Sequence, residues 1–509
     1  MSDICIQNNC NIPAMFNGEC ALHCNKSDYQ TDKMNGKLKE FYDDLEYHIR
    51  KNVLKNSSEE PKKEIASGKY AQENLPTKKQ KIIHLRQIKF PERDPRDEFD
   101  FFKLLKQFKG IHFDDSTIYF GSINLPNVQL FFQDCIFLND WSIHSFLMIE
   151  DVTERTIFQN CVFQGAVTSA SPESAIDKLE IESYLFNDCT FKCQVIFHRG
   201  TYLKSIFFNS EGFIQKICNL HIENCEFKER LLLNKSEIEV LKIQNMEFEG
   251  KVELKECDIK CTLISNVNFK SLFDAYKTKF NQFKMNRSIF DDFSGFEKCE
   301  FGCVGSTSLE KIEFEYVTFL NFTNFRKAKF YSGLDFEHTN LKESPNFLNA
   351  EINYKNTNRE TFRIIKHSFD KIGNQIEANK YFALEMKKYK EELKAKNGFS
   401  AEKAVLWLNE SISNFGSSIF TPLSLMLVTA IIYYFLILGY ENNYVYKIYE
   451  PLNEYIISIS KNLNALAKGI PPYGRFLKEG MEFVTLIYHI FFLTFTWHFI
   501  VAVKRCTKR

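Results

Sequence analysis

Five side chains that can bind a metal lie within the first 24 residues: Cys5, Cys10, Cys20, His23 and Cys24. Four residues separate the first two cysteines, nine separate Cys10 from Cys20, and two more lead to the adjacent His23 and Cys24. Zinc takes four thiolate or imidazole ligands in a tetrahedron, so three cysteines with either His23 or Cys24 would form a Zn²⁺ site. Free thiols are the alternative, because the first gap is longer than the common two-residue knuckle.

The segment around these residues is too short to fold on a hydrophobic core, so bound metal would supply its folding energy. Residues 1–54 are therefore predicted to be a zinc-type module that ends in a helix. That helix has one apolar face, which we expect to pack on the module or on the first repeats: Leu38, Phe41, Tyr42, Leu45 and Ile49. Residues 55–80 are polar, charged and Pro-containing, which predicts a flexible linker.

The chain has 15 cysteines, but its first residues, MSDICIQNNC, lack the basic start and apolar run of a secretory signal. We expect a reduced, cytosolic setting, in which cysteines are free thiols or metal ligands. Three further cysteine pairs share a three-residue gap, Cys189/Cys193, Cys257/Cys261 and Cys299/Cys303. The first member of each pair occupies a small, inward position of the repeat below, so we expect it to be part of the core.

A repeat of 21 residues organises positions 222–352. Ile222, Cys225 and Phe227 recur as Ile243, Met246 and Phe248, and again as Ile264, Val267 and Phe269. Half a period away a second ladder runs in step: Leu233, Ser236, Ile238; Leu254, Cys257, Ile259; Ala275, Thr278, Phe280; Phe296, Cys299, Phe301. Toward the end, large apolar residues alternate at five and six positions, from Phe314 to Ile352. Helices need a different spacing, so these units are short extended segments that bury their apolar residues by stacking.

The units NFTNF, RKAKF, EHTNL and LNAEI resemble those of pentapeptide-repeat proteins, in which a small residue and Asn or Asp precede Leu or Phe. The resemblance implies a right-handed, four-sided β-helix whose bore is filled by the large side chains. The resemblance continues more loosely over Phe132 to Phe227, where similar units recur at irregular intervals: FQDCIF, FQNCVF and FNDCTF. The irregular spacing implies loop insertions between coils. We predict a mainly β fold, a right-handed quadrilateral (pentapeptide-type) β-helix over 131–355. Residues 81–130, with a strand at IIHLRQIKF and a short helix at DEFDFFKLLKQF, are predicted to cap its open end.

Helical periodicity returns after Ile352. Thr357 and Glu360 have the spacing of a capping box, and Gly373-Asn374 is a helix stop between two helical patterns. Residues 356–397 resemble the helical hairpin that follows the repeats in bacterial membrane-anchored pentapeptide-repeat proteins. We predict that this hairpin caps the second end of the β-helix.

Two runs are long and apolar enough to cross a membrane, which predicts transmembrane helices at 419–440 and 483–503. Residues 398–418, with Trp407, are predicted to be an interfacial segment, and 441–482 to be an extracytoplasmic loop with an amphipathic part, LNEYIISISKNLNALAKGI. Lysines precede the first run, and the tail at 504–509 is basic. The positive-inside rule then places both termini in the cytoplasm. The resemblance to bacterial membrane-anchored proteins implies that this membrane is the bacterial inner membrane.

His489 and His498 lie within the second apolar run, where ionisable side chains are candidates for function. Nine residues of helix place them on opposite sides, so one chain cannot use both for one metal or proton. A pore-lining or proton-relay role competes with simple burial of each imidazole in a hydrogen bond against the other span. Two helices cannot enclose a pore and no selectivity-filter run is present, although a homo-oligomer could form one.

The charge distribution and the absence of known catalytic motifs argue against nucleic-acid binding and enzymatic activity. Residues 131–355 carry 33 acidic and 25 basic side chains, a net charge of 25 − 33 = −8, and show no basic stripe with exposed aromatics. We therefore expect no direct nucleic-acid binding. Phosphate-loop, nucleophile-elbow, zinc-protease and kinase motifs are absent, so we expect no enzymatic activity.

These features favour a membrane-anchored β-helical scaffold that presents its repeat surface to a cytoplasmic protein partner. The alternative is an oligomeric membrane effector or ion-conducting protein that the β-helix gates as a sensor. Size in detergent and ion flux into liposomes would separate the two hypotheses.

Overall fold

The computed structural model describes residues 4–7, 10, 12–14, 17–26, 29, 37–54, 82–143, 156–169, 179–303, 312–395, 400–442, 453–470 and 473–507. The predicted linker at 55–80 lies outside these ranges. The chain divides into two compact units, Met1–Asn356 and Thr357–Arg509.

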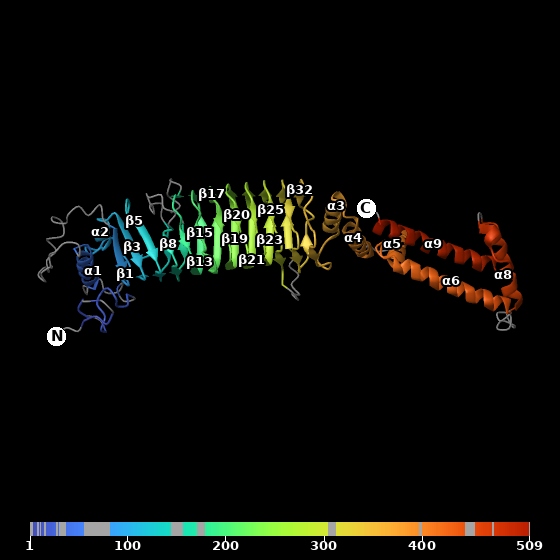
Figure 1. The fold of residues 1–509 in the computed structure, drawn as a ribbon, viewed down its shortest axis with the longest axis horizontal. Coiled ribbons are helices and arrows are strands. Elements are labelled where there is room, and N and C mark those ends of the chain that lie inside the picture. Colours follow the sequence, from blue (N-terminus) through green and yellow to red (C-terminus); the bar gives the residue numbers. More distant parts are fainter. Residues whose placement is uncertain are drawn as a thin grey trace. The chain divides into compact units, whose positions relative to one another are not determined.

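The first unit contains a β-solenoid, in which short parallel strands stack coil on coil in three sheets (Figure 1). The six-stranded sheet contains β1 (Ile82–Arg86), β3 (Gly110–Asp114), β5 (Gln129–Gln133), β8 (Phe158–Gln159), β12 (Phe186–Asn187) and β15 (Phe207–Phe208). The five-stranded sheet contains β18 (Leu231–Leu232), β20 (Val252–Glu253), β22 (Phe273–Asp274), β25 (Ser294–Gly295) and β29 (Thr323–Asn324).

The third sheet has 22 strands among the described residues. They are β2 (Lys89–Phe90), β4 (Thr117–Ile118), β6 (Ile136–Phe137), β7 (Trp141–Ser142), β9 (Val162–Phe163), β10 (Val167–Thr168), β11 (Leu179–Ile181), β13 (Thr190–His198), β14 (Gly200–Tyr202), β16 (Gln215–Glu223), β17 (Glu226–Phe227), β19 (Ser236–Phe248), β21 (Asp258–Phe269), β23 (Lys279–Asn286), β24 (Ile289–Phe290), β26 (Glu300–Phe301), β27 (Ile312–Glu315), β28 (Thr318–Phe319), β30 (Lys329–Phe330), β31 (Leu334–Asp335), β32 (Asn340–Leu341) and β33 (Glu351–Ile352).

The strand register confirms the 21-residue period. Ile243 of β19 pairs with Ile222 of the preceding coil and with Ile264 of the next one. Phe248 likewise pairs with Phe227 and Phe269. Equivalent positions of successive coils therefore lie directly above one another, as the ladder predicts.

Stacked phenylalanines fill the interior of the solenoid. The ring centroids of Phe248 and Phe269 are 5.4 Å apart, those of Phe269 and Phe290 are 4.7 Å apart, and Phe319 continues the stack at 4.9 Å. All four side chains are buried. Truncating one such ring in a core typically costs about 3–5 kcal/mol, so these stacks are a main source of the solenoid's stability.

The chain turns between strands at residues with positive φ. Asn224, Asn245 and Asn266 occupy equivalent corners of three coils, with φ of 54°, 52° and 56°. Among residues with a side chain, Asn is one of the few that tolerate this left-handed conformation well. Asn224, Asn245 and Asn266 thus have a backbone role at the corners of their coils.

The solenoid begins earlier in the chain than the predicted boundary at residue 131. Residues Ile82 to Arg86 of β1 pair in parallel with β3, and β3 pairs with β5, so most of the segment predicted as a cap consists of coils. Two helices lie against these first coils: α1 (Lys37–Leu54) and α2 (Phe102–Leu105). Phe41 of α1 packs edge-on against Phe90 and Phe101, with ring centroids 5.8 and 5.6 Å away.

The second unit consists of helices. The predicted hairpin is α3 (Arg359–Lys371) and α4 (Gln375–Ala395), joined by Gly373 with φ of 76°. The predicted capping box at Thr357 is wrong by one residue, because the Oδ1 atom of Asn358 accepts the hydrogen bond from the backbone of Thr361, while Thr357 is buried. The role of the hairpin as a cap of the solenoid stays a prediction.

Among the described residues, this unit also contains the helices α5 (Ala401–Ser413), α6 (Phe420–Glu441), α8 (Asn453–Lys468) and α9 (Glu482–Thr507), with the 3₁₀ turn η3 (Tyr473–Phe476). Helices α6 and α9 run side by side (Figure 1), and the rings of Tyr433 and Tyr488 stack between them at 4.1 Å. Both helices are long and apolar enough to span a membrane. Asn464 of α8 accepts a hydrogen bond from the backbone of Phe483, which ties α8 to the start of α9.

Candidate metal centre

Cys5, Cys10, Cys20 and His23 form one cluster, in which the four potential ligand atoms all lie within 4.8 Å of one another. Two local features bring them together. The backbone of Cys5 donates a hydrogen bond to Ile12, which folds the first cysteine loop back on itself. A tight turn places His23 beside Cys20, because the backbone N–H groups of both His23 and Cys24 bond to the Cys20 carbonyl.

The distances within the cluster suit tetrahedral zinc. The Sγ atoms of Cys10 and Cys20 are 3.7 Å apart, and the Nδ1 atom of His23 lies 3.2 Å from Cys20 Sγ and 3.4 Å from Cys5 Sγ. With zinc–sulfur bonds of ~2.3 Å, two thiolate ligands of a tetrahedral ion are separated by about 3.7 Å, and a thiolate–imidazole edge is slightly shorter. The cluster could therefore bind a metal such as zinc with only small adjustments.

Cys24 was one of two predicted choices for the fourth ligand, and the structure places it outside the cluster. Its Sγ atom lies 3.8 Å from the carbonyl oxygen of Ala21, 3.5 Å from the hydroxyl of Tyr29 and 3.3 Å from Lys26 Nζ. Adjacent residues in this turn project to different sides, so His23 and Cys24 cannot both face the centre. The imidazole of His23 takes the fourth corner.

Burial sets the protonation of the ligand groups. It raises the pKa of the Cys10 and Cys20 thiols and lowers the pKa of His23 to about 4. The imidazole is therefore neutral at physiological pH, which is the form that binds a metal, whereas the thiols must release protons on binding. Metal occupancy is accordingly expected to fall in acid.

Lys26, which sequence reasoning did not single out, fastens the metal-binding segment to α1. The residue is 1% exposed, and its ammonium donates hydrogen bonds to the carbonyls of Ala21 and Cys24 at 2.6 and 2.8 Å. It also lies over the ring of Phe41, 5.4 Å from its centroid. Burial lowers the pKa of Lys26 to about 8. A lysine in a Cys-rich stretch gives no sequence signal for such burial.

Contacts with the first coils hold the segment against the solenoid. The backbone N–H of Lys89, in β2, donates to the carbonyl of Leu22 at 2.9 Å. The hydroxyl of Tyr119 donates to Asn25 at the same distance. The predicted packing of the helix α1 on the first repeats is confirmed by the contacts of Phe41. The N-terminal segment itself also bonds directly to these coils.

The solenoid cysteines lie where the repeat predicts. Cys189, Cys257 and Cys299 are buried, and the thiols of the last two donate to the carbonyls of Leu233 and Ala275 at 2.7 Å. Burial raises the pKa of Cys257 to about 12, so this thiol is a poor nucleophile and metal ligand. Among the described residues, the N-terminal cluster alone has the geometry of a metal site.

Both histidines of α9 make hydrogen bonds. The Nδ1 atom of His498 lies 3.1 Å from the hydroxyl of Ser413 in α5, and the Nε2 atom of His489 lies 3.4 Å from the carbonyl of Phe476 in η3. The predicted partner for such bonds was the other span, but α5 and η3 supply them instead. These contacts give each imidazole a structural role within one chain.

Comparison with known proteins gives no match, whether to a protein-family model, to a curated protein or to a solved structure. The resemblance to pentapeptide-repeat proteins therefore remains a prediction from the sequence.

Proposed function

We propose that this protein is a membrane-anchored scaffold, which uses its β-solenoid to bind a protein partner and its two apolar helices to hold that complex at the bilayer. The observation that carries the proposal is that one chain contains both a β-solenoid and two helices long and apolar enough to span a membrane. The metal centre would act as a structural zinc site that closes the first end of the solenoid.

The outer surface of the solenoid supports a binding role. Outward charged residues of successive coils pair with one another, as Lys260 does with Glu239 at 2.6 Å and Lys277 with Glu256 at 3.2 Å. Such exposed pairs contribute little to stability, about 0–1 kcal/mol each, but they neutralise the face on which they lie. A partner would therefore meet regular faces on which many charges are already paired, a surface suited to protein recognition.

The finer assignments belong to the same proposal. We propose a right-handed, four-sided solenoid of the pentapeptide type, because inward residues recur every five or six positions over its last coils. The positive charge that flanks both apolar helices favours a bacterial inner-membrane protein with the solenoid in the cytoplasm and α8 on the far side.

Site-specific photo-cross-linking in intact membranes tests the scaffold. A benzophenone amino acid replaces one exposed residue of the full-length chain, at Gln282 on β23 or at Lys216 on β16, and adducts are identified by mass spectrometry. We expect a discrete adduct with another protein from at least one of these two positions. Adducts with a second copy of the chain alone would contradict the scaffold.

A specific observation supports the second candidate, an oligomeric membrane effector. One side of α6 packs on α9, but much of the helix stays open, with exposed fractions of 60% at Leu427, 54% at Ile431 and 65% at Phe435. Lipid or another copy of the chain would cover this face. A defined oligomer in nanodiscs, together with ion flux into liposomes, would favour the effector over the scaffold.

A further inference from the structure

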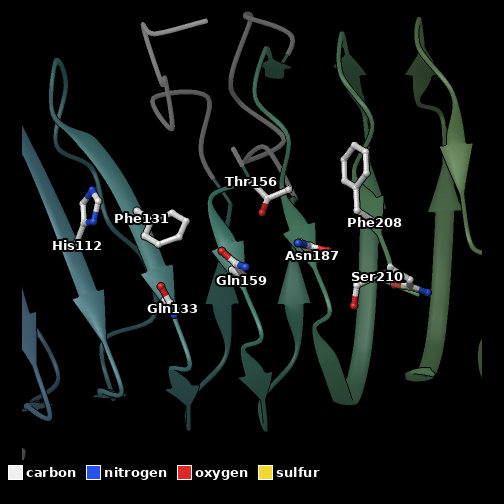
Figure 2. Close-up of a pocket in the computed structure, with 9 residues that line it drawn as sticks. His112, Phe131, Gln133, Thr156, Gln159, Asn187, Phe208 and Ser210 are labelled. Atoms are coloured by element: carbon white, nitrogen blue, oxygen red, sulfur yellow. The ribbon is translucent and has the colours of Figure 1, made fainter. Parts of the chain in front are cut away.

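A groove of about 640 Å³ lies on the outer face of the six-stranded sheet. Four amide side chains line it, those of Gln133, Gln159, Asn187 and Asn209. Figure 2 shows Gln159 and Asn187 in the middle of the groove, with the ring of Phe131 on one side and that of Phe208 on the other.

The amides form a row because the strands are in register. Gln133 of β5 pairs with Gln159 of β8, which pairs with Asn187 of β12. Neighbouring amides are therefore one coil apart, about 4.8 Å. Within the described part of the chain, these three side chains make no hydrogen bond with one another or with other residues.

Asn209 adds an acceptor to this row. Its Nδ2 atom donates to the carbonyl of Asn234 at 2.6 Å, whereas its Oδ1 atom has no hydrogen-bond partner among the described residues. Buried polar atoms normally have partners, so an unsatisfied one at a groove calls for a donor. A bound molecule could provide that donor after a small rotation of the side chain.

Aromatic rings stand at the two ends of the amide row. Phe131 packs against His112 with ring centroids 5.1 Å apart, and Phe208 lies on β15, in register with Asn187 of β12. Three coil steps separate β5 from β15, or about 14 Å. An extended polypeptide rises ~3.4 Å per residue, so this span accommodates about four residues.

The charge of the groove excludes anionic ligands. None of its nine lining residues is Asp, Glu, Lys or Arg, although His112 is among them. Two aspartates stand beside it at the corners of the coils: Asp188, which accepts a hydrogen bond from the backbone of Ser210 at 2.7 Å, and Asp134, which accepts one from Asn160. Phosphate, sulfate or acidic side chains would meet these carboxylates without any fixed positive charge.

From these features we propose that the groove binds an extended, uncharged stretch of about four residues from a partner protein. A side-chain amide offers a donor and an acceptor, as the peptide group does, so a row of amides can pair with the backbone of an extended chain. Two apolar side chains of that chain would rest on Phe131 and Phe208. This inference rests on the proposed scaffold function and names the part of the partner that is recognised.

An oligosaccharide is the competing ligand, because it too bonds to amides. Sugar rings stack on aromatic faces while their hydroxyls bond to nearby amides, which requires a ring beneath the amide row. In Figure 2 the rings instead flank the row. That arrangement suits the alternating side chains of a peptide.

The test uses the full-length protein in nanodiscs and a random dodecapeptide library displayed on phage. Enriched sequences are then synthesised, and their binding is measured by fluorescence anisotropy. We expect a consensus with apolar residues four positions apart, which share a face of an extended chain, and without Asp or Glu. Replacing both central amides, Gln159→Ala with Asn187→Ala, should weaken binding at least about tenfold, since several hydrogen bonds are lost.

Gln282→Ala is the matched control, because Gln282 is an exposed amide on another sheet. It should leave binding within about twofold of the unmodified chain. Equal binding by the double variant, an acidic consensus, or no enrichment would overturn the peptide assignment. So would a neutral-oligosaccharide array that binds the chain and loses that binding in the double variant. A partner that still cross-links to the double variant would leave the scaffold intact and refute the groove alone.

Discussion

The Nδ1 atom of His23 lies 3.2 Å from the Sγ atom of Cys20, close to the separation of two ligands on one tetrahedral metal ion. The next residue in the chain, Cys24, bonds to Ala21 and Tyr29 instead. Imidazole and thiolate are both good zinc ligands, but of these two adjacent residues only His23 faces the candidate metal centre.

His23→Ala should lower zinc affinity by at least ~10-fold, because loss of a ligand costs no less than loss of a residue that orients one. Cys24→Ser should keep the zinc content of the unmodified chain. Both are measured by elemental mass spectrometry after equilibration with a competing chelator under reducing conditions. Zinc well below one equivalent in the unmodified chain, or lost from Cys24→Ser alone, would refute the centre.

Removing the metal should loosen the N-terminal segment and leave the solenoid intact, because the segment has little apolar core of its own. We expect the three cluster thiols, Cys5, Cys10 and Cys20, to react with a thiol reagent much faster after chelation. Hydrogen exchange in β19 and β21 serves as the control and should not change. Unaltered thiol reactivity after chelation would show that metal does not hold this segment.

Phe269→Ala should destabilise the coils around it by about 3–5 kcal/mol, since the ring is stacked between two others and fully enclosed. Hydrogen exchange followed by mass spectrometry should show faster exchange in β19, β21 and β24. Phe322→Ala is the control, because this ring is 37% exposed and its loss should cost about 0.5 kcal/mol or less. Equal effects of the two substitutions would contradict the stacked core.

Glu253 should stabilise its coil in a pH-dependent way. Burial alone would raise the pKa of this carboxyl, but hydrogen bonds from its neighbours, Lys251 and Asn234 foremost, hold it at about 2. Because the folded-state pKa lies below the ordinary value of 4.5, the stabilisation is complete above pH 4.5 and disappears as the pH falls toward 2.

Comparison of Glu253→Gln with the unmodified chain measures this effect. At pH 7 we expect the variant to exchange amide hydrogens in β20 about fivefold faster, equivalent to ~1 kcal/mol once solvent screening is included. The ratio should approach one near pH 2.5. Glu237→Gln, at an exposed pair with Lys216, should change exchange little at either pH. A ratio that grows in acid would contradict the assigned sign.

Alkaline phosphatase, which is active only outside the cytoplasm, tests the orientation. Inserted at Gly469, between α8 and η3, it should be active, and fused after Arg509 it should be inactive. A cytoplasmic fluorescent protein at the same two positions should give the opposite pattern. Activity of the C-terminal fusion would place the tail outside and overturn the predicted topology.

The sequence predicts the middle of the solenoid well, because each coil there repeats its inward residues without interruption. The pairing of Ile243 with Ile264 follows directly from a spacing of 21 residues. The same reasoning does not find the first coils, because their spacing is irregular. Equivalent residues are 28 positions apart from β1 to β3, where the α2 helix is inserted, and 19 apart from β3 to β5. A boundary drawn where periodicity begins is therefore too late.

The candidate sites, too, are predicted by the sequence only in part. Spacing alone identifies the candidate metal ligands but leaves His23 and Cys24 equivalent, because only the path of the turn decides which side chain faces inward. The amide row was visible in the sequence as the second letter of FQDCIF, FQNCVF and FNDCTF. Its meaning as a groove was not, since the flanking Phe131 and Phe208 belong to no shared motif.

The exact superposition of Phe227, Phe248 and Phe269 on successive coils has a consequence for how such a chain changes its size. Deleting or duplicating any 21 consecutive residues in this stretch would join one coil to the next with every inward side chain still above its equivalent. The solenoid can thus be shortened or lengthened in steps of one coil, about 4.8 Å, without redesign of either end. The length of the solenoid can therefore change only in whole coils, and unequal recombination between repeats is sufficient to change it.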